Sequence, residues 1–322
     1  MADQRTTAAT AAPGMVWIPG GAFQMGSNRF YPEEAPPRQV AVDGFWIDTT
    51  PVTNAQFARF VAATGYQTFA EIAPDPCDYP GVDPELLQPG SLLFVPPEGP
   101  VPLNDHAQWW TWSIGADWRH PYGPDSNLDG LDDHPVVHIA HADALAYANW
   151  AGKTLPSEAE WERAARGGLD GKEYAWGDEL APEGRMLANY WQGQFPWQNT
   201  LDDGWLRTSP VRSYPANGYG LYDMIGNVWE WTDDWYVLSA ALAKKAPGCG
   251  CTPRNPRGGH QQDSADPRDA STRLGRRVLK GGSHLCAANY CQRYRPAARF
   301  PQAIDSTTSH IGFRCVLRAE LI

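Results

Sequence analysis

The sequence lacks a long apolar run, an excess of basic residues and a dense set of cysteines. No apolar stretch approaches the roughly 18 residues that a membrane-spanning helix needs, so we expect no membrane span. The formal net charge is -11, whereas nonspecific nucleic-acid binding needs basic patches that neutralise phosphate. We therefore expect no nucleic-acid partner. Six cysteines in 322 residues are too few for a scaffold built from disulfides.

The N-terminal residues lack the apolar core of a signal peptide. We interpret residues 1–14 as a disordered tail and expect a cytoplasmic, monomeric protein. Cysteines in such a protein serve in metal binding, in catalysis or in plain burial. Neither an internal repeat nor a linker between two cores is visible, so residues 15–322 are expected to form one α+β domain.

Aromatic and turn-forming residues are plentiful. The chain has 15 Trp, 31 Gly and 29 Pro, while 42% of its residues are apolar. Trp is large and rigid and packs well between irregular segments. This composition predicts a loop-rich fold held by aromatic side chains.

Strand signals lie near both ends of the sequence. Residues 15–18 and 23–25 flank Gly20-Gly21, which predicts a hairpin. Residues 40–42 and 45–47 predict a further strand pair. Shorter strands are expected at 219–222, 229–231, 278–280 and 312–317.

Three helices are indicated by their boundary residues. Thr53 is a fair N-cap for a helix that ends at Gly65. A second helix is expected from Ala142 to Trp150. Ser157 and Glu160 form an S-x-x-E capping box for the third. Residues 67–133 show neither the periodicity of a helix nor that of a strand. Their Trp cluster nevertheless predicts an ordered, packed segment that walls a binding groove.

The strongest local signal is the segment GGSHLCAANYCQRYRPAAR at 281–299. Cys286 and Cys291 meet only if the chain reverses between them, and residues 287–290 suit a four-residue hairpin loop in which Asn289 tolerates a left-handed backbone. The two Cβ atoms would then lie roughly 4.5–5.5 Å apart.

That spacing allows a disulfide or a soft metal between two thiolates, and inert thiols remain an equal alternative. Thiolate ligands select Cu(I) over hard cations, and two ligands are too few for structural zinc. Nearby arginines, among them Arg293, would lower the pKa of the thiols.

This segment resembles the signature of the formylglycine-generating enzymes, also called sulfatase-modifying factors. The resemblance covers nearly the whole chain and is weakest at 67–105 and 238–276. Further matching segments are MVWIPGGAFQMGS at 15–27, DGFWIDTTPVTNAQFARFV at 43–61, DWRHPYGPDSNLDGLDDHPVVHIAHADALAYANWAGKTLPSEAEWERAARGG at 117–168, ANYWQGQFPWQNTLDDG at 188–204, NGYGLYDMIGNVWEWTDDWY at 217–236 and SHIGFRC at 309–315.

The resemblance implies a single C-type-lectin-like catalytic domain with little regular secondary structure. It implies Cu(I) held by Cys286 and Cys291, and a sulfatase-type protein or peptide with a C-x-P-x-R motif as substrate. The substrate cysteine becomes Cα-formylglycine with O2 and a reductant. The catalytic residues carried over by the resemblance are Cys286, Cys291, Ser283, Tyr290, Trp229 and Arg293.

The same family carries structural Ca2+, for which oxygen ligands are suited. By resemblance, the first site uses Asn189, Tyr190 (main chain), Asp203 and Trp205 (main chain). The second uses Asp223, Gly226 (main chain), Val228 (main chain) and Glu230.

This sequence departs from some relatives in its cysteines and near the pocket. Ala148, Ala165 and Pro296 stand where vertebrate relatives place disulfide cysteines, and the resemblance implies that Cys315 has no partner. His310 replaces an Asn of some relatives. Two alternatives remain: a non-catalytic C-type-lectin-like binding module, and an iron-dependent enzyme like the sulfoxide synthases. Neither an H-x3-H-x-E run nor room for an added helical domain is present. His134, His138 and His141 are not expected to converge.

Overall fold

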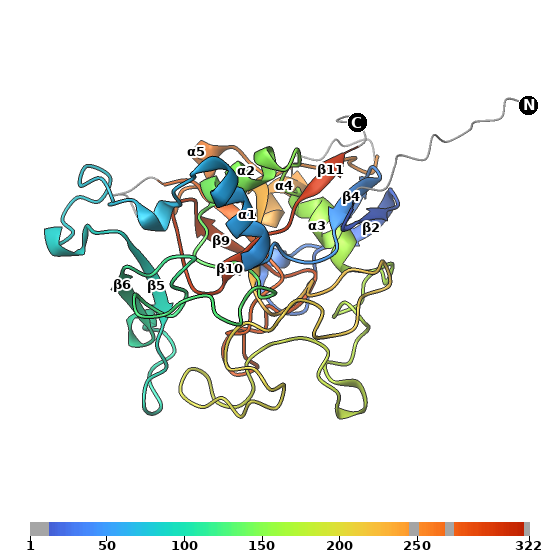
Figure 1. Ribbon diagram of the computed structural model, residues 1–322. Helices are drawn as coiled ribbons and strands as arrows, with labels where there is room; N and C mark the ends of the chain where they lie inside the picture. The colour runs from blue at the N-terminus through green and yellow to red at the C-terminus, as the bar shows by residue number, and fades with distance from the viewer. Residues whose placement is uncertain (1–12, 245–250, 268–273, 319–322) are drawn as a thin grey trace, which may run out of the picture.

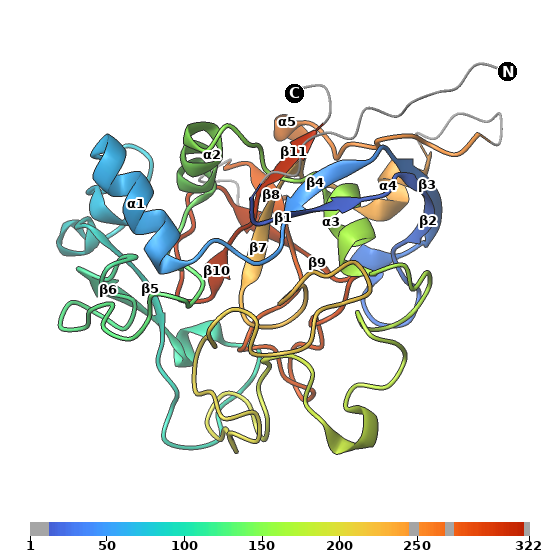
Figure 2. The same cartoon turned by 45° about the vertical axis from the view of Figure 1, so that its right-hand side comes forward.

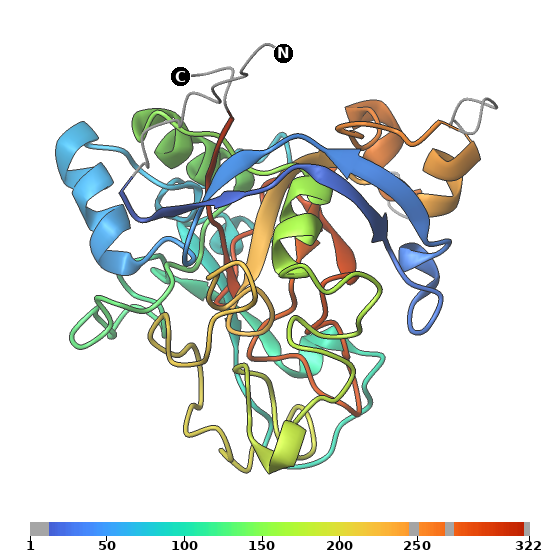
Figure 3. The ribbon, with the colours of Figure 1, turned by 90° about the vertical axis from the view of Figure 1, so that its right-hand side faces the viewer.

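Regular secondary structure is sparse and short, and long loops connect its elements. The computed structural model describes residues 13–244, 251–267 and 274–318. Most of the tail predicted for residues 1–14 lies outside these ranges. Figure 3 shows the helices and most strands gathered in one half of the molecule, with the loops between α3 and β7 filling the other.

The strands pair over long sequence distances. Strand β4 (Phe45–Asp48) lies between β1 (Met15–Ile18) and β11 (Val316–Arg318), antiparallel to both. Strand β2 (Gly21–Met25) pairs with β3 (Arg38–Val42). The predicted hairpin at Gly20-Gly21 is therefore wrong, and so is the pairing of 40–42 with 45–47. Both strands of each predicted pair exist, but each pairs elsewhere.

A four-stranded sheet runs through the middle of the molecule in the order β10-β7-β8-β9. Its strands are β7 (Trp229–Trp235), β8 (Arg276–Lys280), β9 (Arg299–Ala303) and β10 (Ile311–Gly312). A separate hairpin joins β5 (Gly90–Phe94) to β6 (Trp110–Ile114). The sequence of this region showed no strand periodicity, so this hairpin was not predicted. Residues 219–222, where a strand was expected, form a loop.

The helices begin and end where local signals place them. Helix α1 (Asn54–Thr64) has the capping box of Thr53 and Gln56 and ends at Gly65, whose φ is 68°. Helix α2 (His141–Trp150) lies near α1, and both flank the sheets (Figure 2). Helix α3 (Glu158–Ala165) has the predicted Ser157–Glu160 box. Two short helices, α4 (Ser239–Lys244) and α5 (Gln261–Ser264), follow β7.

Two apolar clusters form the interior. The larger one joins the helices to the central strands around Trp161 and Trp231. The smaller one packs Phe94, Trp109, Trp191 and Phe195 against the turn that carries the cysteines. Within the described residues, no helix is both long and apolar enough to cross a bilayer. The single α+β domain with little regular structure is thus confirmed.

Candidate active site

The two cysteines of the 281–299 segment lie at a tight chain reversal. Cys291 N donates to Ala287 O at 2.8 Å, and Tyr290 N donates to the same oxygen at 3.1 Å. The expected reversal is present, but no strands flank it, so it is a turn within loops and not a hairpin. Asn289 is not left-handed; its side chain instead bonds both Phe195 N and Phe195 O.

The sulfurs of Cys286 and Cys291 are 3.1 Å apart. A disulfide would place them about 2.05 Å apart, so both thiols are free. Cys286 is buried, and burial raises the pKa of its thiol. The hydrogen bond from Cys286 is the largest cause that lowers the pKa of Cys291 to about 7. When the pair loses a proton, the negative charge therefore forms on Cys291 and not on Cys286.

Arg293 supports that charge from one side. Its Nη1 lies 3.7 Å from the Sγ of Cys291, and its Nη2 pairs with Glu33 at 2.6 Å. The guanidinium also stacks over the ring of Tyr31, with 3.8 Å to the centroid. Tyr31 and Glu33 come from the other end of the chain, and no local signal in the sequence identified them.

A cavity of about 340 Å³ opens above the sulfurs. Tyr290 stacks on Phe195 with ring centroids 4.6 Å apart, and Trp109 meets Tyr290 edge-on at 5.4 Å. These aromatic walls include Trp109 and Trp110 from the segment that we expected to line a groove. All six proposed catalytic residues line the cavity: Cys286, Cys291, Ser283, Tyr290, Trp229 and Arg293.

Ser283 and Trp229 are both buried. The hydroxyl of Ser283 accepts a hydrogen bond from Leu285 N at 3.2 Å, and its own backbone N lies 3.5 Å from the Sγ of Cys286. Ser283 thus touches the sulfur site through its backbone. Trp229 comes from β7 and donates its backbone N–H to His310 O at 2.9 Å.

His310, which directly precedes β10, also lines the cavity. Its Nδ1 lies 2.6 Å from the hydroxyl of Thr308, and its ring packs on Trp110 at 4.8 Å. Burial, together with the nearby His284 and His138, holds its pKa well below the usual range. His310 is therefore a neutral imidazole at pH 7.

His134, His138 and His141 are buried and bond different partners, as expected. His138 bonds Ser91 and Pro121 O, whereas His134 bonds Thr208. His141 lies near Asp233 at 3.9 Å. The described residues bring together no group of three or more His, Cys, Asp or Glu side chains suited to a metal.

Gln192 links two members of the first predicted calcium set, Tyr190 and Asp203, whereas the side chain of Asn189 donates to Arg207 O at 2.8 Å. The side-chain amide of Gln192 donates to Tyr190 O, and its Oε1 accepts from Asp203 N at 3.3 Å. Asp203 Oδ1 accepts from Trp205 N at 2.9 Å, whereas its buried Oδ2 has no hydrogen-bond partner. Burial raises the pKa of Asp203. A buried carboxylate oxygen without a partner suits a cation.

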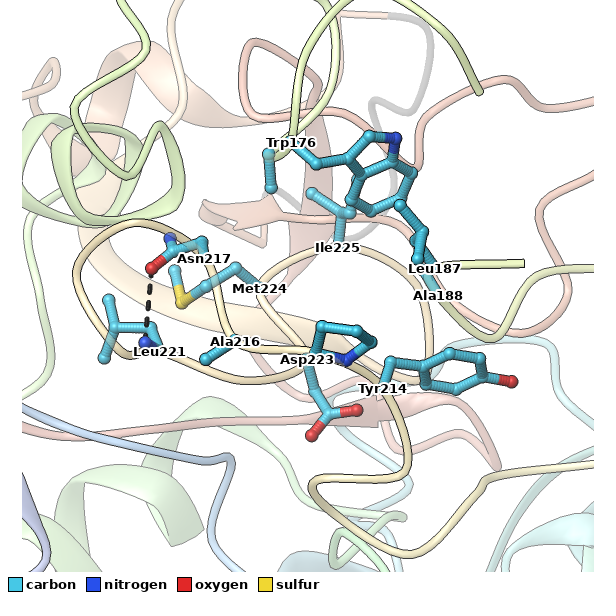
Figure 4. Close-up of a pocket in the computed structure, with 12 residues that line it drawn as sticks. Trp176, Leu187, Ala188, Tyr214, Ala216, Asn217, Leu221, Asp223, Met224 and Ile225 are labelled. Atoms are coloured by element: carbon cyan, nitrogen blue, oxygen red, sulfur yellow. Dashed lines mark hydrogen bonds between the residues drawn. The ribbon is translucent and has the colours of Figure 1, made fainter. Parts of the chain in front are cut away.

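In the second predicted set, the carboxylates of Asp223 and Glu230 have different surroundings. Burial raises the pKa of Asp223 to about 6, and a cation would relieve that cost. Asp223 borders a small cavity of about 50 Å³ that Tyr214 also lines (Figure 4). The carboxylate of Glu230 is committed elsewhere: Arg314 contacts both oxygens and Trp161 Nε1 donates to Oε2 at 2.7 Å. Its lone pairs are used, so this side chain does not fit a calcium ligand.

Comparison with known proteins places this geometry in context. Residues 2–319 match the model of the family described as "sulfatase-modifying factor enzyme 1-like domain". The formylglycine-generating enzyme of Mycobacterium tuberculosis is 54% identical over 94% of this chain and 97% of its own length. An inactive Cα-formylglycine-generating enzyme 2 from Mus musculus is 37% identical over 95% of this chain and 86% of its own. Among solved structures, PvdO from Pseudomonas aeruginosa has a TM-score of 0.60 at 22% identity, covering 94% of this chain and 93% of its own.

Proposed function

Because the chain belongs to the sulfatase-modifying factor enzyme 1-like family, we propose that it generates formylglycine. Its substrate is the cysteine of a C-x-P-x-R motif in a sulfatase-type protein, and its product is Cα-formylglycine. One observation carries the proposal: two free thiols 3.1 Å apart at the base of an aromatic cavity. An inactive relative exists, so family membership needs this support.

Cu(I) is the cofactor that this donor set fits. Cys286 and Cys291 offer two soft sulfurs, and soft sulfur ligands select Cu(I) over hard cations. Cys286 and Cys291 would hold the copper, which would supply the redox chemistry between the substrate thiolate and O2. The low pKa of Cys291 favours binding, because the thiolate is the metal-binding form.

The overall reaction balances with O2 and a reductant. The substrate CH2–SH carbon loses two electrons and a C–H bond, its C–S bond breaks, and sulfur leaves as sulfide. O2 accepts these two electrons and two more from the reductant, with two protons. The net products are the aldehyde, sulfide and one water.

Residues of the chain prepare the cavity for this reaction. Arg293 stabilises the thiolate of Cys291, and Glu33 and Tyr31 fix the position of its guanidinium. Tyr290 and Trp229 contribute aromatic surface to the cavity that holds the sulfurs, and this surface would limit the entry of water. Ser283 would orient a polar group near Cys286.

Calcium is proposed as a structural ion. Asn189, Asp203 and the carbonyls of Tyr190 and Trp205 would hold the first ion, where Asp203 Oδ2 lacks a partner. At the second position the proposal rests on Asp223 with the carbonyls of Gly226 and Val228, without the carboxylate of Glu230. Neither the binding-module reading nor the iron-dependent one has a specific observation of the described residues in its favour.

The test is turnover of a peptide. The copper-loaded protein is incubated with O2, a reductant and a C-x-P-x-R peptide, and mass spectrometry follows loss of the thiol and gain of the aldehyde. We expect Cys286→Ser and Cys291→Ser each to abolish both copper binding and turnover. The matched control is Cys77→Ser, an exposed thiol outside the cavity, which should retain both. Full turnover by either active-site variant would contradict the proposal.

A further inference from the structure

Four aromatic rings outside the catalytic cavity form one stack. Trp176 and Tyr174 have ring centroids 5.6 Å apart at an interplanar angle of 13°. Tyr174 and Tyr294 follow at 6.4 Å and 19°, and Tyr190 covers Tyr294 at 4.6 Å and 27°. Near-parallel stacking at such distances is a favoured arrangement of aromatic pairs. The fold thereby places four oxidisable side chains in contact, one after another.

The inner end of the stack reaches the two cysteines. Tyr294 follows Cys291 by three residues and lies with Cys286 in the same buried apolar cluster. Burial is the largest cause that raises the pKa of Tyr294, and charge on the nearby Cys286 and Cys291 raises it further. Tyr294 is 2% exposed and is not part of the cavity lining. It therefore approaches the sulfurs from the protein interior.

The outer end of the stack reaches the surface. Tyr174 and Trp176 lie in the loops that follow α3, coloured yellow-green in the lower part of Figure 1. Tyr174 is 8% exposed, whereas Trp176 is half-buried and its indole N–H donates to Glu179 O at 2.8 Å. The nearby Asp178 is exposed. A reagent in solution therefore meets Trp176 but not the inner rings.

The chemistry of these groups suits the transfer of single electrons. Thiolates, phenols and indoles are the side chains that most readily give up one electron, and a phenol that does so also releases its proton. Burial raises the pKa of Tyr174 most, and Glu173 raises it further by its charge and by a hydrogen bond. The carboxylate of Glu173 can therefore hold the proton of Tyr174 until the electron is replaced.

We propose that the stack is an electron-transfer path between the two cysteines and the surface, with Trp176 as the contact for a one-electron redox partner. None of the four rings lines the catalytic cavity, so a substrate polypeptide that fills the cavity would not block the path. The inference does not depend on copper or on the proposed oxidase reaction. That reaction would give the path a use, because electrons could enter while the substrate covers the sulfurs.

In the metal-free protein the path leads to a defined product. An oxidant at the surface takes one electron from Trp176, which recovers an electron from Tyr174. Tyr174 recovers one from Tyr294, and Tyr294 recovers one from the thiolate of Cys291. The rings are unchanged overall. Two such transfers convert the Cys286 thiol and the Cys291 thiolate into a disulfide, with release of two electrons and one proton. The two sulfurs already lie 3.1 Å apart.

The experiment uses tris(bipyridine)ruthenium(III), a one-electron oxidant of indoles and phenols. This bulky cation is too large for a cavity of about 340 Å³ and is attracted by the net charge of -11. It is mixed with the full-length, metal-free protein without O2, and peptide mapping by mass spectrometry measures the Cys286–Cys291 disulfide. We expect Trp176→Phe, Tyr174→Phe and Tyr294→Phe each to lose most of this disulfide, because phenylalanine keeps the stacking but resists oxidation.

The matched controls are Tyr147→Phe and Trp150→Phe. Tyr147 is buried in the same apolar cluster, Trp150 is 44% exposed, and neither belongs to the stack. Both variants should form as much disulfide as the unchanged protein. Undiminished disulfide in the three stack variants, or an equal loss in the controls, would overturn the path. A loss confined to Tyr290→Phe would also overturn it, because the electrons would then pass through the cavity wall.

This measurement uses neither copper nor a substrate peptide. Its outcome is therefore independent of whether the chain generates formylglycine, and turnover of the C-x-P-x-R peptide decides that question separately.

Discussion

The charge on Cys291 is set by single neighbours. A hydrogen bond from Cys286, followed by Arg293, lowers the pKa of Cys291 to about 7. Asp75 instead raises the pKa of the exposed Cys77. The pKa of Cys291 is thus lowered and that of Cys77 is raised. Each thiol can therefore serve as the reference for the other in one experiment.

Alkylation of the metal-free protein as a function of pH should show this difference. The thiolate is the reactive form, so modification of Cys291 should rise with pH around a midpoint near 7, and that of Cys77 should rise only at higher pH. Arg293→Gln should move the midpoint of Cys291 upward, because a stabilising positive charge is lost. Peptide mapping by mass spectrometry measures both sites in one sample. Coincident midpoints would contradict the placement of the charge on Cys291.

A buried ion pair carries a further residue-scale prediction. Arg295 and Glu34 are 1% and 0% exposed, with contacts of 2.9 and 2.5 Å. Glu34→Ala leaves the guanidinium buried and unpaired, so we expect the free energy of unfolding to fall by about 3–5 kcal/mol. Urea denaturation measures it. The exposed pair of Arg185 and Glu183 is the control: Glu183→Ala should change stability by less than about 1 kcal/mol.

At the scale of elements, local features were predictable from the sequence and distant ones were not. The caps at Thr53 and Ser157 and the reversal at 286–291 depend on residues within a few positions of each other. Strand pairing depends on contacts across the chain, such as β4 with β11, and a period of two in one segment does not name its partner. The β5–β6 hairpin was missed because its strands flank a long loop and show no clear alternation.

In the candidate active site, too, local features were predictable from the sequence and distant ones were not. Its lining residues within 281–299 were identified, and the surrounding ring of Trp109, Phe195 and Tyr31 was not assigned to them. These residues reach the cysteines through contacts between segments more than 80 residues apart along the chain, such as that of Asn289 with Phe195, where the separation is 94. The resemblance predicted which residues would hold calcium, but it did not reveal that Arg314 pairs with the carboxylate of Glu230.

The end of α1 provides an element-scale test. Gly65 has a φ of +68°, and a Cβ there would meet nothing within 4 Å. Gly65→Ala should therefore lower the free energy of unfolding by about 1 kcal/mol through backbone strain alone. Gly99 also has open space but no positive φ, so Gly99→Ala should be neutral or slightly stabilising. Equal effects of the two substitutions on thermal or urea unfolding would show that the left-handed backbone at Gly65 does not determine the loss of stability.

For the whole molecule, buried titratable groups set the response to acid. Burial lowers the pKa of His138, His141 and His284 to about 4. In the unfolded chain these histidines titrate near 6.5, so the unfolded state binds more protons between about pH 6.5 and 4. Their contribution to stability is complete above pH 6.5 and is lost as the pH falls towards 4. Asp143 and Asp223, whose pKa values burial raises to about 6, act in the opposite direction over part of this window.

We therefore expect the free energy of unfolding to decrease between pH 6.5 and 4. His141→Gln should make this decrease shallower by up to about 1.4 kcal/mol per pH unit, the value for one proton. The exposed His106 is the control: His106→Gln should leave the slope unchanged. Urea midpoints at several pH values measure it. An identical slope for His141→Gln and the unchanged protein would contradict this account.

Trp191 directly follows Asn189 and Tyr190 in the chain, and its backbone N–H donates to Cys286 O at 2.9 Å. Asn227 N donates to Asn189 O at 2.8 Å, and His284 N donates in turn to Asn227 O at 3.0 Å. The peptide groups of the first predicted calcium set thus belong to the same hydrogen-bonded network as those beside the sulfurs. On the proposed assignment of Ca2+ to the first set and Cu(I) to the two thiols, we expect a chelator selective for Ca2+ to loosen this hydrogen-bonded network and thereby to weaken copper binding.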